Sequence, residues 1–121
     1  MLIYVYDGSF EGLLSAIYQS NARKERPDRI LAQQGLSMNF LDNYFSVETD
    51  PEQADKVASS IRFRISESAF HQVMQVFLSE HPERGSLIDR YIRLGFKLGP
   101  SVDDHLHENS VLSVQQLTLR V

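Results

Sequence analysis

The sequence predicts a mainly helical α+β domain: two short strands, residues 2–6 and 44–48, form a β-α-β unit with a helix between them, and about four helices follow. Two runs of β-branched and aromatic residues support the strands. Apolar residues that recur at offsets of three and four support the helices. The chain has 121 residues, of which 42% are hydrophobic, enough to bury one core. We therefore expect residues 1–121 to form a single domain.

The first strand and helix are the clearest part of the pattern. "LIYVY", residues 2–6, is typical of a mostly buried strand. Asp7 or Ser9 can cap the next helix, because their side chains accept hydrogen bonds from its first N–H groups. "YDGSFEG", residues 6–12, also has the glycines and the helix start that anion sites use. It matches neither a P-loop nor a dinucleotide fingerprint, so a tight turn with a cap is the favoured interpretation.

Residues 24–44 show no clear period, although "RILAQQ" within them is compatible with a short extended piece. A link of this length without structure is unusual in a compact domain. We therefore expect either a functional loop or a segment that leans on a partner. "YFSVE", residues 44–48, predicts the second strand, parallel to the first because the chain crosses over through a helix.

Caps, prolines and a glycine mark the ends of the later helices. Thr49 or Asp50 can cap a helix that starts at Pro51, where the missing proline N–H costs nothing. The remaining expected boundaries are a start at Ser66, a helix over residues 85–98 that ends at Gly99, and a last start at Asn109 or Ser110.

The helix over residues 85–98 has two distinct faces. At about 100° per residue, Arg93 and Lys97 fall within roughly 60° of Arg90, whereas the apolar residues spread over the opposite side. Grouped cations repel one another, so a facing anion would stabilise them, and arginine suits phosphate because its planar fork donates two parallel hydrogen bonds. Arg62 and Arg64 can extend this candidate nucleic-acid or anion-binding face. The alternatives are a solvated outer face, helix-dipole complementarity and an intramolecular salt bridge.

"VDDHLHEN", residues 102–109, contains the ligand types that zinc, iron or manganese accept. Asp103, His105 and His107 are the candidate metal ligands. His-x-His spacing works best on a strand, where both side chains share a face, and this stretch is predicted to be a turn. Turn hydrogen bonds are the favoured interpretation, and we expect neither a metal nor another cofactor. No catalytic constellation is evident, so catalytic residues are not assigned.

The composition excludes several classes of protein. The chain has no cysteine, hence no disulfide and no thiolate site, and no apolar run approaches the roughly 18 residues of a membrane helix. We therefore expect a cytoplasmic protein without a membrane partner. The net charge of -4 argues against non-specific coating of nucleic acid. Residues 1–60 hold five Lys/Arg against nine Asp/Glu, and residues 61–121 hold seven against seven, so a local basic face remains possible in the second half.

Four blocks of the sequence together resemble an uncharacterised bacterial family whose usual label is probable DNA metabolism protein. The blocks are "LIYVYDGSFEGLLSAIY" (2–18), "VETDPEQADKV" (47–57), "FLSEHPERGSLIDRYIRLGFKLG" (77–99) and "VDDHLHENSVL" (102–112). The resemblance covers essentially the whole chain. It implies a radical S-adenosylmethionine (radical SAM) protein as partner and a link to uracil-DNA glycosylase-like domains, hence a role in DNA repair. Family members usually continue further, so we expect residues 1–121 to be the N-terminal part of a longer domain.

Three hypotheses follow from these patterns. The leading one is an accessory, nucleic-acid-associated module in DNA metabolism. In this hypothesis the basic helix face contacts DNA. The second is a docking domain that binds the radical SAM protein through residues 24–44 without touching nucleic acid. The third is a metal-dependent enzyme that uses the cluster at residues 103–108.

Overall fold

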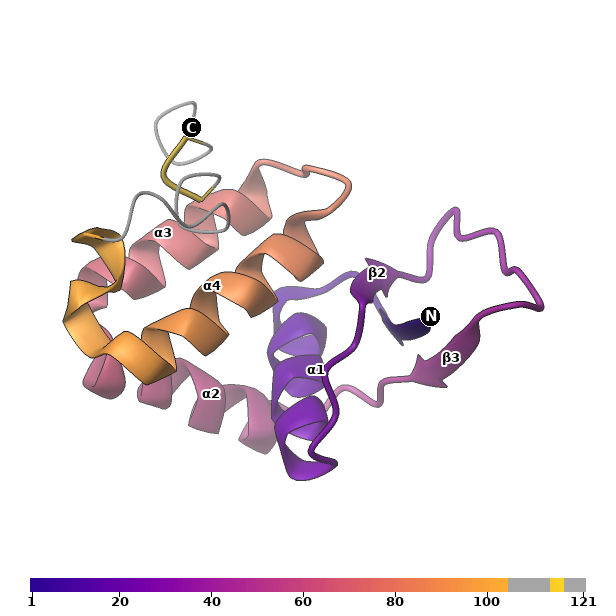
Figure 1. Cartoon of the computed structure of the whole chain (residues 1–121), viewed down its shortest axis with the longest axis horizontal. Coiled ribbons are helices and arrows are strands. Elements are labelled where there is room, and N and C mark those ends of the chain that lie inside the picture. Colours follow the sequence, from indigo (N-terminus) through magenta and orange to yellow (C-terminus); the bar gives the residue numbers. More distant parts are fainter. Residues whose placement is uncertain (105–113, 117–121) are drawn as a thin grey trace. The chain divides into compact units, whose positions relative to one another are not determined.

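The computed structural model describes residues 1–104 and 114–116, and the chain divides into two compact units, residues 1–57 and 58–121 (Figure 1). The elements in order are β1 (Leu2–Tyr6), α1 (Phe10–Ala22), β2 (Arg29–Ala32), β3 (Asn43–Ser46), α2 (Pro51–Arg64), α3 (Glu67–Leu78), α4 (Arg84–Leu98) and the 3-10 helix η1 (Gly99–Asp104). Residues 114–116 are also helical. The predicted mainly helical α+β class is confirmed.

The sheet of the first unit has three parallel strands in the order β2-β1-β3. Tyr4 in the central strand is opposite Ile30 on one side and Phe45 on the other. Both predicted strands are present and parallel to each other, and the sheet has a third strand: β2 lies inside the segment without a clear period, and β3 covers Asn43–Ser46 instead of residues 44–48. β2 was foreseen only as a short extended piece because it has four residues, of which only Ile30 is fully buried, too few to show a period.

The start of α1 confirms the predicted tight turn with a cap. The Ser9 hydroxyl accepts a hydrogen bond from the Gly12 N–H at 2.9 Å. Asp7 in turn accepts from the Ser9 N–H at 2.9 Å and from the Ser9 hydroxyl at 2.6 Å. These hydrogen bonds hold the pKa of Asp7 below its ordinary value. The Asp7 carboxylate thus accepts the hydrogen bonds that a bound anion would otherwise accept.

Two of the later helices, α2 and α3, begin at the predicted caps. Asp50 accepts from the Glu52 N–H at 2.9 Å at the start of α2, and the Ser66 hydroxyl accepts from the Ala69 N–H at 2.9 Å at the start of α3. Gly99 follows α4 with a φ of 66°, a backbone conformation that glycine adopts without strain.

The second unit packs the end of α2 closely against α4. Ile65 and Ile61 are buried, and so are Val73 of α3 and Ile92 of α4. A Cβ added at Gly95 would lie 2.3 Å from the Ile65 Cδ1 atom, so only glycine permits this approach without displacing the isoleucine. Among residues 1–104 and 114–116, none of the helices has the length and apolar character that crossing a bilayer would require.

Candidate functional site

Arg93 does not belong to the outer face of α4 in the way its spacing suggested. Its Nε lies 3.0 Å from both carboxylate oxygens of Asp89, one turn earlier on the same helix. Asp89 is only 4% exposed, and a buried carboxylate is costly unless a cation and hydrogen bonds compensate it. Of the alternatives for the stripe, the intramolecular salt bridge therefore applies to Arg93, whose guanidinium compensates the buried charge of Asp89.

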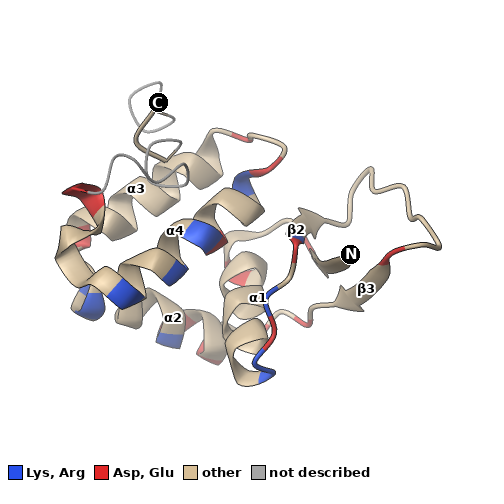
Figure 2. Ribbon diagram, viewed as in Figure 1, with Lys and Arg blue, Asp and Glu red and all other residues tan. Residues whose placement is uncertain are grey.

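The other two cations of the predicted stripe, Arg90 and Lys97, are exposed. Figure 2 shows basic positions (blue) spaced along α4. Lys97 lies in the last turn, where a cation also complements the negative end of the helix dipole. The structure thus divides the predicted stripe into one cation that serves the protein interior and two that face solvent.

Arg64 connects the end of α2 to the end of α4. Its Nη2 donates to the backbone oxygen of Phe96 at 3.3 Å, and its Cζ lies 4.4 Å from the centre of the Phe96 ring. A Cβ at Gly99 would meet the Arg64 carbonyl oxygen at 3.6 Å, so the backbones also come close here. The contact with Phe96 therefore places Arg64 against the last turn of α4, the turn that also contains Lys97.

Arg62 is held on a different neighbour. Its Nε lies 3.5 Å from the Glu67 Oε1 atom, and its Cζ lies 4.1 Å from the centre of the Phe70 ring in α3. Both members of the ion pair are substantially exposed, so solvent screens their attraction and the pair contributes little stability. Arg62 therefore remains a cation of the surface, with its plane fixed by the phenylalanine beneath it.

Sequence analysis missed Phe63, which lies between these two arginines. Its side chain is 90% exposed, although it belongs to a helix whose buried positions include Val57 and Ile61. We call Arg62, Phe63, Arg64 and Lys97 the basic edge. The signal that would have found Phe63 is the tripeptide Arg-Phe-Arg, with an aromatic residue outside the apolar stripe.

The carboxylate of Asp103, one of the candidate metal ligands, accepts hydrogen bonds inside the second unit. It accepts from the Tyr91 hydroxyl at 2.7 Å and from the Gln72 amide at 3.2 Å. Burial and this hydrogen bond raise the pKa of Tyr91. The other two candidates, His105 and His107, lie outside the described residues. Within the described ranges, no three His, Cys, Asp or Glu side chains are grouped so as to hold a metal ion.

A second surface lies on the loop between β2 and β3, within residues 24–44. Three large apolar side chains are exposed there: Met38 by 69%, Phe40 by 95% and Leu41 by 74%. We call these three residues the apolar loop surface. Exposed apolar side chains that gather in one place mark sites of contact with other molecules more often than isolated ones do.

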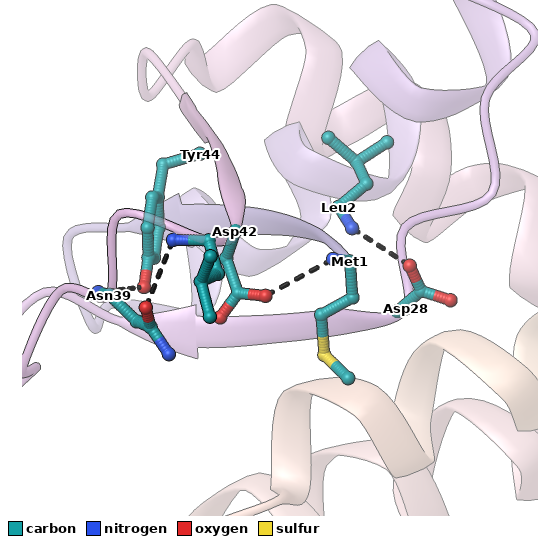
Figure 3. Close-up of polar contacts among 7 residues, drawn as sticks. Met1, Leu2, Asp28, Asn39, Asp42 and Tyr44 are labelled. Atoms are coloured by element: carbon teal, nitrogen blue, oxygen red, sulfur yellow. Dashed lines mark hydrogen bonds and ion pairs between the residues drawn. The ribbon is translucent and has the colours of Figure 1, made fainter.

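Hydrogen bonds hold this loop in a defined conformation (Figure 3). The Asn39 N–H donates to the Tyr44 hydroxyl at 2.7 Å, and the Asn39 side chain accepts from the Leu41 N–H at 2.9 Å. The Met1 ammonium lies 3.1 Å from Asp42, so the end of the loop is tied to the beginning of β1. The apolar loop surface is therefore displayed on a braced backbone.

A polar cluster closes the end of α1 against the sheet in the first unit. The Tyr4 hydroxyl donates to Glu25, whose Oε1 lies 2.8 Å from the Arg23 Nε. The Arg23 guanidinium lies 4.1 Å above the Phe45 ring. Burial, followed by the hydrogen bond to Glu25, raises the pKa of Tyr4 to about 12. The Tyr4 and Phe45 ring centroids lie 4.8 Å apart, so each of the four side chains contacts two of the others and this cluster serves the fold.

Comparisons with known proteins provide no further assignment: no family model, curated protein or solved structure was found to match the chain. The resemblance to the DNA metabolism family stays a prediction. Function has to be argued from the basic edge and the apolar loop surface.

Proposed function

We propose that this protein is an accessory module in DNA metabolism that binds nucleic acid through the basic edge, beside a radical SAM partner. The observation that carries the proposal is the contact of Arg64 with Phe96, which places Arg64 of α2 against the last turn of α4, where Lys97 also lies. The sequence resemblance supplies the context of DNA repair.

Charge at the basic edge favours a polyanion. Arg62, Arg64 and Lys97 contribute three positive charges, whereas each helix C-terminus contributes about half a negative charge. Even with Glu67 included, these groups sum to a positive charge. Arg64 and Arg62 each rest on a phenylalanine ring, so less side-chain entropy is lost when they contact phosphate.

Charge reversal tests the proposal. The double variant Arg64→Glu/Lys97→Glu is compared with Arg26→Glu/Lys56→Glu, which reverses two exposed cations of the first unit and changes the net charge equally. Binding of a fluorescein-labelled oligonucleotide is followed by anisotropy over a range of salt concentrations. Each lost phosphate contact should reduce the slope of log affinity against log salt by about 0.9 for duplex and about 0.7 for single strands.

The control double variant should retain the slope of the unaltered protein. Circular dichroism and thermal unfolding establish that both double variants are folded. If the unaltered protein shows no salt-sensitive binding, or if both double variants lose it equally, the nucleic-acid proposal is wrong.

A second candidate function is docking onto a protein partner, which the apolar loop surface favours. Interface energy concentrates in a few large side chains near the centre of a contact. A braced loop loses little conformational entropy on binding, which leaves more of the apolar contact energy as affinity. The resemblance suggests the radical SAM protein as the partner.

Co-purification of the two proteins at high salt tests this candidate. High salt weakens ionic contacts but not apolar ones. The variant Phe40→Ser/Leu41→Ser should lose the partner, whereas Leu78→Ser, which removes an exposed leucine of α3, should retain it. Equal retention by both variants would contradict docking through the loop.

A further inference from the structure

We propose that Phe63 makes the basic edge a site for single-stranded nucleic acid, in which an unpaired base stacks on the phenylalanine ring. This inference rests on the proposed function and goes beyond it, because phosphate contacts alone do not distinguish a single strand from a duplex. It assigns a role to an aromatic residue that the packing of the protein does not explain.

The Phe63 side chain is exposed to solvent and contributes little to the packing of the protein. Burying a phenylalanine side chain stabilises a folded protein by about 1.5–3 kcal/mol relative to leaving it exposed. Phe63 is 90% exposed, so it contributes little of this stabilisation to the fold. α2 has its buried positions elsewhere, among them Ala54, Val57 and Ile61. The ring is thus presented to solvent from a rigid helix, and not from a mobile loop.

Phe63 lies between two arginines that leave its ring uncovered. At about 100° per residue, Arg62 and Arg64 leave the helix on either side of Phe63. Each guanidinium lies over another ring, Phe70 or Phe96. In the described part of the chain, the rings that lie under a guanidinium are those of Phe45, Phe70, Phe77 and Phe96. The two arginines therefore flank the Phe63 ring without covering it.

The chemistry of the ligand follows from this combination. An aromatic ring flanked by cations suits a chain in which flat bases alternate with phosphates, because the ring stacks on a base while the cations neutralise the backbone. A protein partner would need an apolar pocket surrounded by acidic groups. A polyanion with stacking surfaces matches the basic edge without that additional requirement.

The preference for single strands has a separate reason. In a duplex each base is already stacked on its neighbours and paired, so exposing one base costs a few kcal/mol. An unpaired base has its face available at little cost. Phe63 should therefore add affinity for single-stranded nucleic acid and little for duplex, whereas Arg64 and Lys97 should contribute to both.

Matched leucine variants test the inference. Phe63→Leu keeps an apolar side chain but removes the ring, and Phe40→Leu makes the same change at the exposed phenylalanine of the apolar loop surface. Binding of labelled oligothymidylate and of a duplex is measured by anisotropy. Phe63→Leu should weaken single-strand binding by about 5- to 150-fold, which corresponds to the loss of one stacked base. Phe40→Leu should leave it unchanged, and duplex binding should change little in either variant.

A fluorescence experiment reports on stacking directly, because the chain has no tryptophan. Phe63→Trp introduces a single indole at the proposed site, and Phe40→Trp introduces one at the control position. Oligothymidylate should quench the indole at position 63, and should leave the one at position 40 unaffected. Phe63→Trp should also bind single strands at least as tightly as the unaltered protein, since the larger ring retains the stacking surface.

The outcomes separate this inference from the proposed function. If Phe63→Leu binds single strands as tightly as the unaltered protein while Arg64→Glu/Lys97→Glu binds weakly, the stacking site is wrong and phosphate binding at the basic edge stands. Equal loss of single-strand and duplex binding in a folded Phe63→Leu variant also overturns the single-strand preference. If the unaltered protein binds no nucleic acid, both proposals fall together.

Discussion

The two units of this protein each expose a phenylalanine, and the groups around it differ. Phe40 of the first unit lies on a loop with Met38 and Leu41, and residues 1–57 carry nine acidic side chains against five basic ones. Phe63 of the second unit lies between Arg62 and Arg64, and residues 58–121 carry equal numbers of each sign. An exposed ring thus takes its significance from its neighbours, which favour an apolar protein contact in one unit and a nucleic acid in the other.

The same comparison applies to the arginines. Arg23 of the first unit is held between Glu25 and the Phe45 ring, and Arg93 of the second is bound to the buried Asp89. These cations stabilise the fold. Arg64 rests on Phe96 but belongs to an exposed edge. Among these three arginines, only Arg93 has a buried carboxylate as its partner, Asp89, and residue spacing does not reveal that burial.

The largest effect that we predict concerns Arg93. Arg93→Ala removes the cation from a carboxylate that is 4% exposed, so the free energy of unfolding should fall by about 3–5 kcal/mol. Lys97→Ala, on the same helix but exposed, should change it by no more than about 0.5 kcal/mol. Urea denaturation measures both. Equal effects of the two substitutions would show that Arg93 contributes no more to stability than the exposed Lys97.

A smaller effect should come from Tyr4 at alkaline pH. Its pKa is raised from the ordinary 10.0 to about 12 in the folded state, so the unfolded chain loses this proton first. The contribution of Tyr4 is therefore fully present below pH 10, and stability should fall by about 1–3 kcal/mol as the pH rises from 10 to 12.

Tyr4→Phe removes the titrating group and serves as the control. Denaturation curves of the two proteins, measured from neutral pH to pH 12, should differ in their pH dependence over this interval. Parallel stability profiles would show that the cluster of Tyr4, Glu25 and Arg23 does not protect the phenol, and would weaken its assignment to the fold.

The smallest effect on stability should be at the apolar loop surface. Asn39→Ala removes the acceptor of the Leu41 N–H, at a cost of about 0.5–1.5 kcal/mol. Ser37→Ala, at an exposed position of the same loop, is the control. Hydrogen exchange of the Leu41 amide should accelerate in the first variant only. Unchanged exchange would show that the loop is not braced as described, which would weaken the docking candidate.

Local signals in the sequence predicted most of the fold. The caps at Ser9, Asp50 and Ser66 act through side-chain hydrogen bonds within three residues, so spacing along the chain is sufficient to find them. β2 was foreseen only as one interpretation of "RILAQQ", a short extended piece, because its four residues become a strand only by pairing with β1. A partner strand distant in the chain is not visible in a local pattern.

The candidate site could be predicted only in part. Helical periodicity placed Arg90, Arg93 and Lys97 on one stripe. Asp89 is one turn before Arg93, a spacing at which side chains of opposite charge can pair, but the burial of Asp89 was not visible in the sequence. Phe63 was missed, although its position between two arginines and outside the apolar stripe of α2 is visible in the sequence. Residue type and spacing suggest candidates, whereas burial determines which of them remain accessible.

The sequence by itself determined the α+β class, the starts of α1, α2 and α3 and the excess of acidic groups in the first half, since each depends on composition or on neighbours a few residues apart. Only the tertiary structure decided which arginines are paired inside and that Arg64 meets Phe96 beside Lys97. The contact between Arg64 and Phe96 joins residues of separate helices, and it depends on the packing around Ile65 and Gly95 that brings α2 and α4 together. The pair of Arg93 and Asp89 lies within one helix, but the burial of Asp89 comes from the packing around that helix.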